Sequence, residues 1–83
     1  MPKNGPTPET QRIGAVIREL RTARGMTTTE LAAQIGSAQQ TVSNWECGTN
    51  SPAIADLPRV AEGLGISPIT LAKKILQKML CAD

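Results

Sequence analysis

The chain has 83 residues, 40% of them hydrophobic and 19% charged, which fits one globular domain with a small core. Trp45 is the only aromatic residue, so the core must be aliphatic, which favours packed helices over a β-sandwich. The net charge of +2 is compatible with a polyanionic partner but does not indicate one, because many solvated surfaces carry as much.

The N-terminal segment, the lengths of the apolar runs and the cysteines indicate the domain organisation and the compartment of the protein. Residues 1–7 are expected to form a flexible N-terminal arm, followed by a single domain over residues 8–83. The sequence shows neither an apolar run of membrane-spanning length nor a signal peptide, which predicts a cytoplasmic protein. Cys47 and Cys81 lie far apart and the chain has no His, so no metal is expected, and two reduced thiols are favoured over a disulfide.

A first helix is predicted from Pro8 to about Arg24. Thr7 can accept a hydrogen bond as the N-cap, proline suits the first helical position, and Gly25 can close the helix in the left-handed conformation. Its apolar residues recur at helical spacing: Ile13, Val16, Ile17 and Leu20.

A second and a third helix follow in close succession. Thr27-x-x-Glu30 predicts a capping box at the start of the second helix, which ends at Gly36. Ser37-x-x-Gln40 predicts another capping box directly afterwards, so one helix ends and the next begins within a residue or two. The apolar face of the second helix consists of Leu31, Ala32 and Ile35.

The third helix is expected over Ala38–Glu46, with Gly48 as its C-terminal glycine cap. At about 100° per residue one side of it is apolar and should be buried. That side consists of Ala38, Val42 and Trp45. For Trp45, a place in the core is favoured over a stacking role toward a ligand.

Two further helices complete the expected fold. Asp56 is a suitable N-cap for the fourth helix, Pro58 fits its first turn, and Gly65 ends it. Ser67 and a following proline predict a fifth helix over about 68–80. This helix carries more apolar residues than one narrow stripe requires. The residues in question are Ile75, Leu76, Met79 and Leu80. Either all four cover the chain's own core, or some of them face a second subunit in a homodimer.

The outer face of the third helix carries only uncharged hydrogen-bonding side chains: Gln39, Gln40, Ser43 and Asn44. An ordinary solvated helix usually carries Lys and Glu on this face. In the DNA major groove Gln and Asn can bond adenine through two hydrogen bonds, and Ser can bond several base edges. From composition alone, a polar exposed helix without a partner remains an equal alternative.

Two consecutive segments, Gly25–Gly36 and Ser37–Gly48, resemble the helix-turn-helix of the XRE family, the regulators similar to lambdoid phage repressors and Cro. Further matches lie at Ile17–Arg21, at Ser51-Pro52 and at Leu64–Ile66, so the resemblance covers roughly residues 12–72. It implies an all-α, five-helix, lambda-repressor-like DNA-binding domain, with the second helix across the DNA backbone and the third in the major groove.

The resemblance also implies roles for individual residues. Gln39, Gln40, Ser43 and Asn44 match base-reading positions. Thr28 and Asn50 match positions that usually contact phosphate, and Arg21 and Glu46 match a pair that joins the first and third helices. Two residues depart from the family pattern: Thr28 stands where Gln is usual, and Cys47 stands where a basic or amide residue is common.

The third helix contains no Lys or Arg, so neutralisation of phosphate is expected from elsewhere, from Arg12, Arg18 or Lys3. The resulting hypothesis is a sequence-specific transcriptional regulator, a repressor, that binds a pseudo-palindromic operator in double-stranded DNA. The alternative is a protein-interaction module such as an antitoxin or an adaptor. An enzyme, a cofactor and a small-molecule substrate are not expected, because the sequence lacks His and a glycine-rich phosphate loop.

Overall fold

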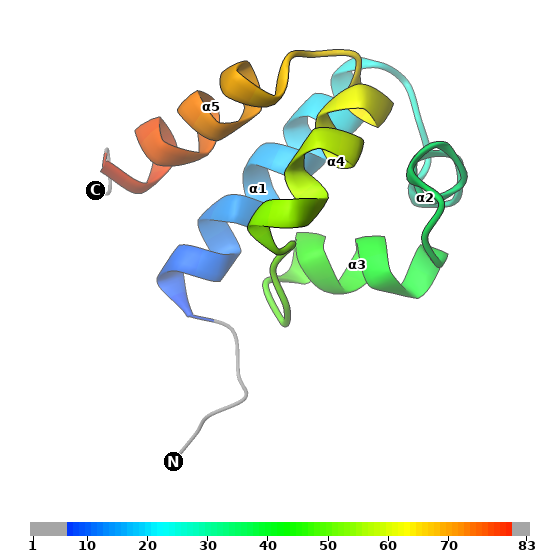
Figure 1. Cartoon of the computed structure of the whole chain (residues 1–83). Coiled ribbons are helices and arrows are strands. Elements are labelled where there is room, and N and C mark those ends of the chain that lie inside the picture. Colours follow the sequence, from blue (N-terminus) through cyan, green and yellow to red (C-terminus); the bar gives the residue numbers. More distant parts are fainter. Residues whose placement is uncertain (1–6, 81–83) are drawn as a thin grey trace.

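Five α-helices and one short 3-10 helix make up most of residues 7–80, the part of the chain that this computed structural model describes (Figure 1). The helices are α1 (Pro8–Ala23), α2 (Thr28–Ile35), α3 (Gln39–Cys47), η1 (Ile54–Asp56), α4 (Leu57–Leu64) and α5 (Pro68–Leu80). The prediction of an all-α, five-helix fold is confirmed. The proposed arm, apart from Thr7, lies outside the described residues, as do Lys3 and Cys81.

The first two helices begin as their capping residues predict. Thr7 Oγ1 accepts a hydrogen bond from the backbone N–H of Thr10 at 3.1 Å, and Pro8 occupies the first turn of α1. At α2 the bonds are reciprocal: the Glu30 N–H donates to Thr27 Oγ1, and the Thr27 N–H donates to Glu30 Oε1. At both helix starts these bonds satisfy backbone N–H donors that the helix itself leaves without partners.

The prediction of a capping box at Ser37-x-x-Gln40 is wrong. The backbone N–H of Ser37 donates to the Ala32 carbonyl at 2.9 Å, so Ser37 belongs to the C-terminal cap of α2. The chain therefore needs one more residue to turn, and Ala38 becomes the N-cap of α3 without a side-chain hydrogen bond. Ala38 is consequently exposed and not buried as predicted.

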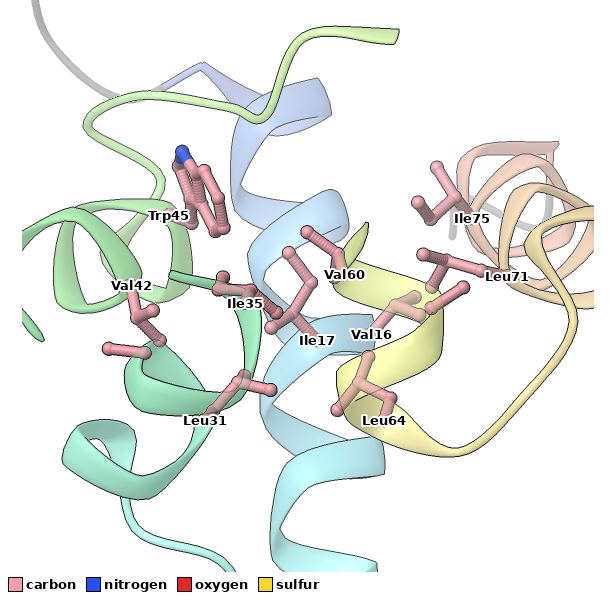
Figure 2. Close-up of a cluster of buried hydrophobic side chains, with 12 residues drawn as sticks. Val16, Ile17, Leu31, Ile35, Val42, Trp45, Val60, Leu64, Leu71 and Ile75 are labelled. Atoms are coloured by element: carbon pink, nitrogen blue, oxygen red, sulfur yellow. The ribbon is translucent and has the colours of Figure 1, made fainter. Parts of the chain in front are cut away.

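A single aliphatic core joins all five helices, and Trp45 closes one end of it (Figure 2). The prediction that Trp45 is a core residue is confirmed, because only 5% of it is exposed. The buried hydrophobic residues are Val16, Ile17, Leu31, Ala32, Ile35, Val42, Trp45, Val60, Ala61, Leu64, Leu71 and Ile75. Among the described residues, no helix has both the length and the apolar character needed to cross a bilayer.

The fourth helix starts where Asp56 predicts, but the Asp56 side chain does not cap it. The carboxylate bonds Arg59 at 2.7 Å and accepts from the Ala53 N–H at 3.1 Å, so it closes η1 instead. Both bonds lower the pKa of Asp56, the one from Arg59 more strongly. At the next helix Ser67 Oγ accepts from the Ile69 N–H at 3.1 Å, as expected for a helix beginning at Pro68.

The fifth helix divides its apolar residues between two surroundings. Ile75 is buried and Met79 packs against the core, so these two residues cover this chain's own interior. Leu76 and Leu80 are 57% and 84% exposed, and neither is part of the core. The four residues therefore do not all cover the chain's own core, and a second subunit facing Leu76 and Leu80 stays a prediction.

The backbones of α1 and α3 approach each other closely at Gly14. A Cβ atom at this position would lie in steric conflict with the Trp45 carbonyl oxygen and 2.7 Å from that of Glu46. Gly14 has an ordinary helical backbone and is buried, so its role is to let the two helices meet. No local sequence signal identifies it, since glycine within a helix otherwise only weakens the helix.

An ion pair joins the same two helices about two turns further along α1. Arg21 Nε and Nη2 donate to the two carboxylate oxygens of Glu46 at 2.6 and 3.0 Å, and Arg21 Nη1 donates to the Met26 carbonyl at 2.6 Å. The side chains are only 13% and 8% exposed, and the hydrogen bond to Glu46 raises the pKa of Arg21. The fork-to-carboxylate geometry fixes the orientation of α3 on α1.

Replacement of Gly14 tests the close approach of the helices. Gly14→Ala is expected to lower the free energy of unfolding by about 1–3 kcal/mol, because the added methyl group must displace backbone atoms of α3. Urea denaturation measures the change. At the exposed helical position Ala33, Ala33→Gly should also destabilise the protein, by about 1 kcal/mol through helix propensity alone. Propensity would make Gly14→Ala stabilising, so an increase in stability would contradict the steric argument.

Removal of one partner tests the ion pair. Glu46→Ala is expected to cost about 3 kcal/mol of unfolding free energy, because it leaves the Arg21 guanidinium largely buried without its carboxylate. The control is Glu19→Ala, which breaks the exposed pair with Lys78 and should cost less than about 1 kcal/mol. Equal losses in the two variants would show that the Arg21–Glu46 pair adds little to stability.

Candidate nucleic-acid interface

The surface that the sequence singles out lies on α3 and on the adjoining start of α2. Figure 1 shows α2 end-on beside α3, which lies across the view, so the two helices cross steeply. Gly36 ends α2 with a left-handed backbone (φ 72°), which allows the abrupt change of direction. Val42 and Trp45 anchor α3 in the core, and its opposite side faces outward.

The four predicted base-reading residues lie on this outward side and form two pairs. Gln39 Nε2 donates to Ser43 Oγ at 2.7 Å, and Gln40 Nε2 donates to Asn44 Oδ1 at 3.1 Å. Both glutamines are exposed, and both of their partners are half-buried. These bonds along the helix restrict side chains that would otherwise sample many rotamers, so the polar groups are preorganised for a partner.

Thr28 connects this network to α2. Besides its bond to Ser43, Gln39 Nε2 donates a hydrogen bond to Thr28 Oγ1 at 3.0 Å, although Gln39 and Thr28 are eleven positions apart in sequence. The family resemblance implies only a phosphate contact for Thr28 and gives no sign of this bond. No spacing rule within one helix could have indicated it, because the bond depends on how α2 and α3 cross.

The structure brings some of the predicted phosphate-contacting residues to this surface and leaves one apart. Arg18 is exposed and lines a shallow hollow together with Thr28, Ser43 and Cys47. Asn50 is exposed just beyond α3, and its backbone N–H donates to the Asn44 carbonyl at 3.3 Å. Arg12 lies half-buried on α1, and among the described residues no side-chain hydrogen bond or ion pair joins it to the outward side of α3.

The charge on this surface comes from its edge. The outward face of α3 has no charged side chain, since Glu46 is turned inward to Arg21. Within residues 7–80, Arg12 and Arg18 form no ion pair, so their full charge is available to an anion. Cys47 is an exposed free thiol in the same hollow. Such a surface offers many hydrogen bonds and few charges.

Comparison with known proteins supports the helix-turn-helix class that the sequence resembles. The model of the helix-turn-helix family matches residues 17–71. An uncharacterized HTH-type transcriptional regulator of Sinorhizobium fredii, y4dJ, is 34% identical over 59 residues, which are 71% of this chain and 77% of that protein. The restriction-modification controller protein C.AhdI of Aeromonas hydrophila is 29% identical, with a TM-score of 0.74 over 78% of this chain and 98% of its own.

Two less similar structures bear on the fold alone. The wild-type restriction-modification controller protein C.Esp1396I has a TM-score of 0.80 at 21% identity, covering 92% of this chain and 99% of that one. The clp gene regulator ClgR of Corynebacterium glutamicum has a TM-score of 0.78 at 24% identity, with coverage of 92% and 99%. The expected lambda-repressor-like arrangement is thereby confirmed. The chain belongs to the helix-turn-helix family and is a DNA-binding domain of the XRE, Cro/C1 type.

Proposed function

We propose that this protein is a sequence-specific repressor that occupies an operator with α3 in the major groove. The observation that carries the proposal is the outward face of α3, where four uncharged polar side chains are ordered by their own hydrogen bonds. Amides and hydroxyls of this kind match the donors and acceptors of base edges. The base-reading residues are Gln39, Gln40, Ser43 and Asn44.

Contacts to phosphate are assigned to three residues around that face, Thr28, Asn50 and Arg18, and to Arg12, which lies apart from it on α1. Thr28 and Arg18 are supported by the hollow that they share beside Ser43, and Asn50 by its exposure at the end of α3. With only two arginines in this set, few counterions are released on binding, and the salt dependence of affinity should be shallow. One subunit therefore binds DNA weakly.

A second copy of the chain would supply the missing affinity. Three exposed apolar residues of α5, Ile69, Leu76 and Leu80, follow one another at intervals of seven and four, which places them on one stripe. In Figure 1 α5 lies at the upper left and α3 to its lower right, so pairing through α5 leaves the reading face free. Two joined subunits bind two half-sites with a large gain in avidity, which explains a pseudo-palindromic operator.

Selection of preferred sequences from random DNA tests the base-reading assignment. The wild-type protein should enrich a defined motif, and the double variant Gln39→Ala, Gln40→Ala should lose about 1–3 kcal/mol of discrimination for each good bidentate contact. Gln34→Ala, which removes an exposed glutamine of α2, is the matched control and should keep the motif. A motif unchanged in the double variant would refute the assignment. If the wild-type protein enriches no motif, the alternative hypothesis of a protein-interaction module is favoured.

Sedimentation equilibrium tests the pairing through α5. Leu76→Glu with Leu80→Glu should convert a dimer into a monomer with an unchanged helical circular dichroism spectrum, because both side chains lie outside the core. Ile54→Glu changes an apolar residue that is 85% exposed elsewhere, and this control should remain dimeric. A wild-type protein that stays monomeric at high concentration would contradict the proposed dimer.

A further inference from the structure

We propose that Gln39 reads its base through the carbonyl oxygen alone and therefore selects a base that carries an exocyclic amino group, cytosine or adenine. Thr28 and Ser43 impose this polarity by accepting both amide hydrogens of Gln39. The inference rests on the proposed function, because it concerns which base the reading face selects.

The chemistry of the side chain sets the limit. A carboxamide has two N–H donors and one carbonyl acceptor. The Gln39 nitrogen lies 3.0 Å from Thr28 Oγ1 and 2.7 Å from Ser43 Oγ, both within hydrogen-bonding range, so both of its donors are engaged. Within residues 7–80, no hydrogen bond occupies the side-chain carbonyl oxygen of Gln39. That oxygen is the group left for a ligand.

The neighbouring glutamine provides an internal contrast. Gln40 Nε2 makes one bond, to Asn44 Oδ1 at 3.1 Å, and so keeps a second N–H and its carbonyl oxygen free. Gln40 retains the donor–acceptor pair that matches N7 and N6 of adenine. Two adjacent residues of the same type thus present different patterns to DNA.

The major groove distinguishes these patterns. Cytosine N4 and adenine N6 are the amino donors there, whereas guanine N7 and O6 and thymine O4 are acceptors. A carbonyl oxygen without a neighbouring N–H is repelled by acceptors, so guanine and thymine are disfavoured at the edge facing Gln39. Because the Thr28 hydroxyl accepts from Gln39, its own hydrogen remains available to a phosphate oxygen, and Thr28 acts as a positioning residue for Gln39.

The experiment compares sequence preferences of the wild-type protein and of variants at Thr28. The base pair read by Gln39 is identified first, as the one at which Gln39→Ala alone relaxes the selected motif. Thr28→Val removes the hydroxyl and frees one N–H, and should reduce discrimination at that base pair roughly tenfold while leaving the others unchanged. Thr28→Ser keeps the hydroxyl and should keep the preference. Thr29→Val, at the exposed neighbouring threonine, is the matched control.

A second variant covers a folding defect in Thr28→Val, which circular dichroism would reveal. Ser43→Ala removes the other acceptor and should relax the same base pair, in addition to any base pair that Ser43 itself reads. Cytosine or adenine facing Gln39, with the relaxation in Thr28→Val confined to that base pair, supports the proposal. Guanine or thymine there, or an equal loss of affinity for every sequence in Thr28→Val, overturns it while the proposed function stands. If the wild-type protein selects no motif, the proposed function fails and this inference fails with it.

Discussion

The close approach of α1 and α3 is the constraint on which the rest of the structure depends. Gly14 lets the two backbones meet, and the Arg21–Glu46 pair then fixes how α3 is rotated. That rotation decides which residues of α3 enter the core with Trp45 and which face outward. It also places the start of α2 beside α3, so the bond from Gln39 to Thr28 is a consequence of this packing.

The elements of the fold could be predicted because their signals are local. The Thr27-x-x-Glu30 box forms as expected, since each partner lies within one helical turn of the other. The similar pattern at Ser37-x-x-Gln40 forms no capping box, because Ser37 takes part in a competing interaction. Its backbone N–H donates to the Ala32 carbonyl and so belongs to the C-terminal end of α2. The two patterns look alike in sequence, and only the spacing between the two helices distinguishes them.

The outward face of α3 was likewise predictable from helical geometry, because residues spaced by 100° fall on known sides of a helix. The contacts between elements were not. The Thr28–Gln39 bond, the role of Gly14 and the division of α5 between buried Ile75 and exposed Leu76 all depend on how helices cross. Periodicity marks a residue as apolar or polar, but which neighbour covers it is decided by tertiary packing.

In the proposed function, stability and recognition are carried by opposite sides of the same helix. Val42 and Trp45 are buried, whereas Gln40 is fully outside the core and bonds only to Asn44 on its own helix. Exchanges at such outward positions alter no core contact, so they change the unfolding free energy little. A protein that reads its operator in the proposed way can therefore acquire new operator preferences through single substitutions without losing its fold. Gln39 is the exception, since its bond to α2 ties a change of specificity there to the fit between two helices.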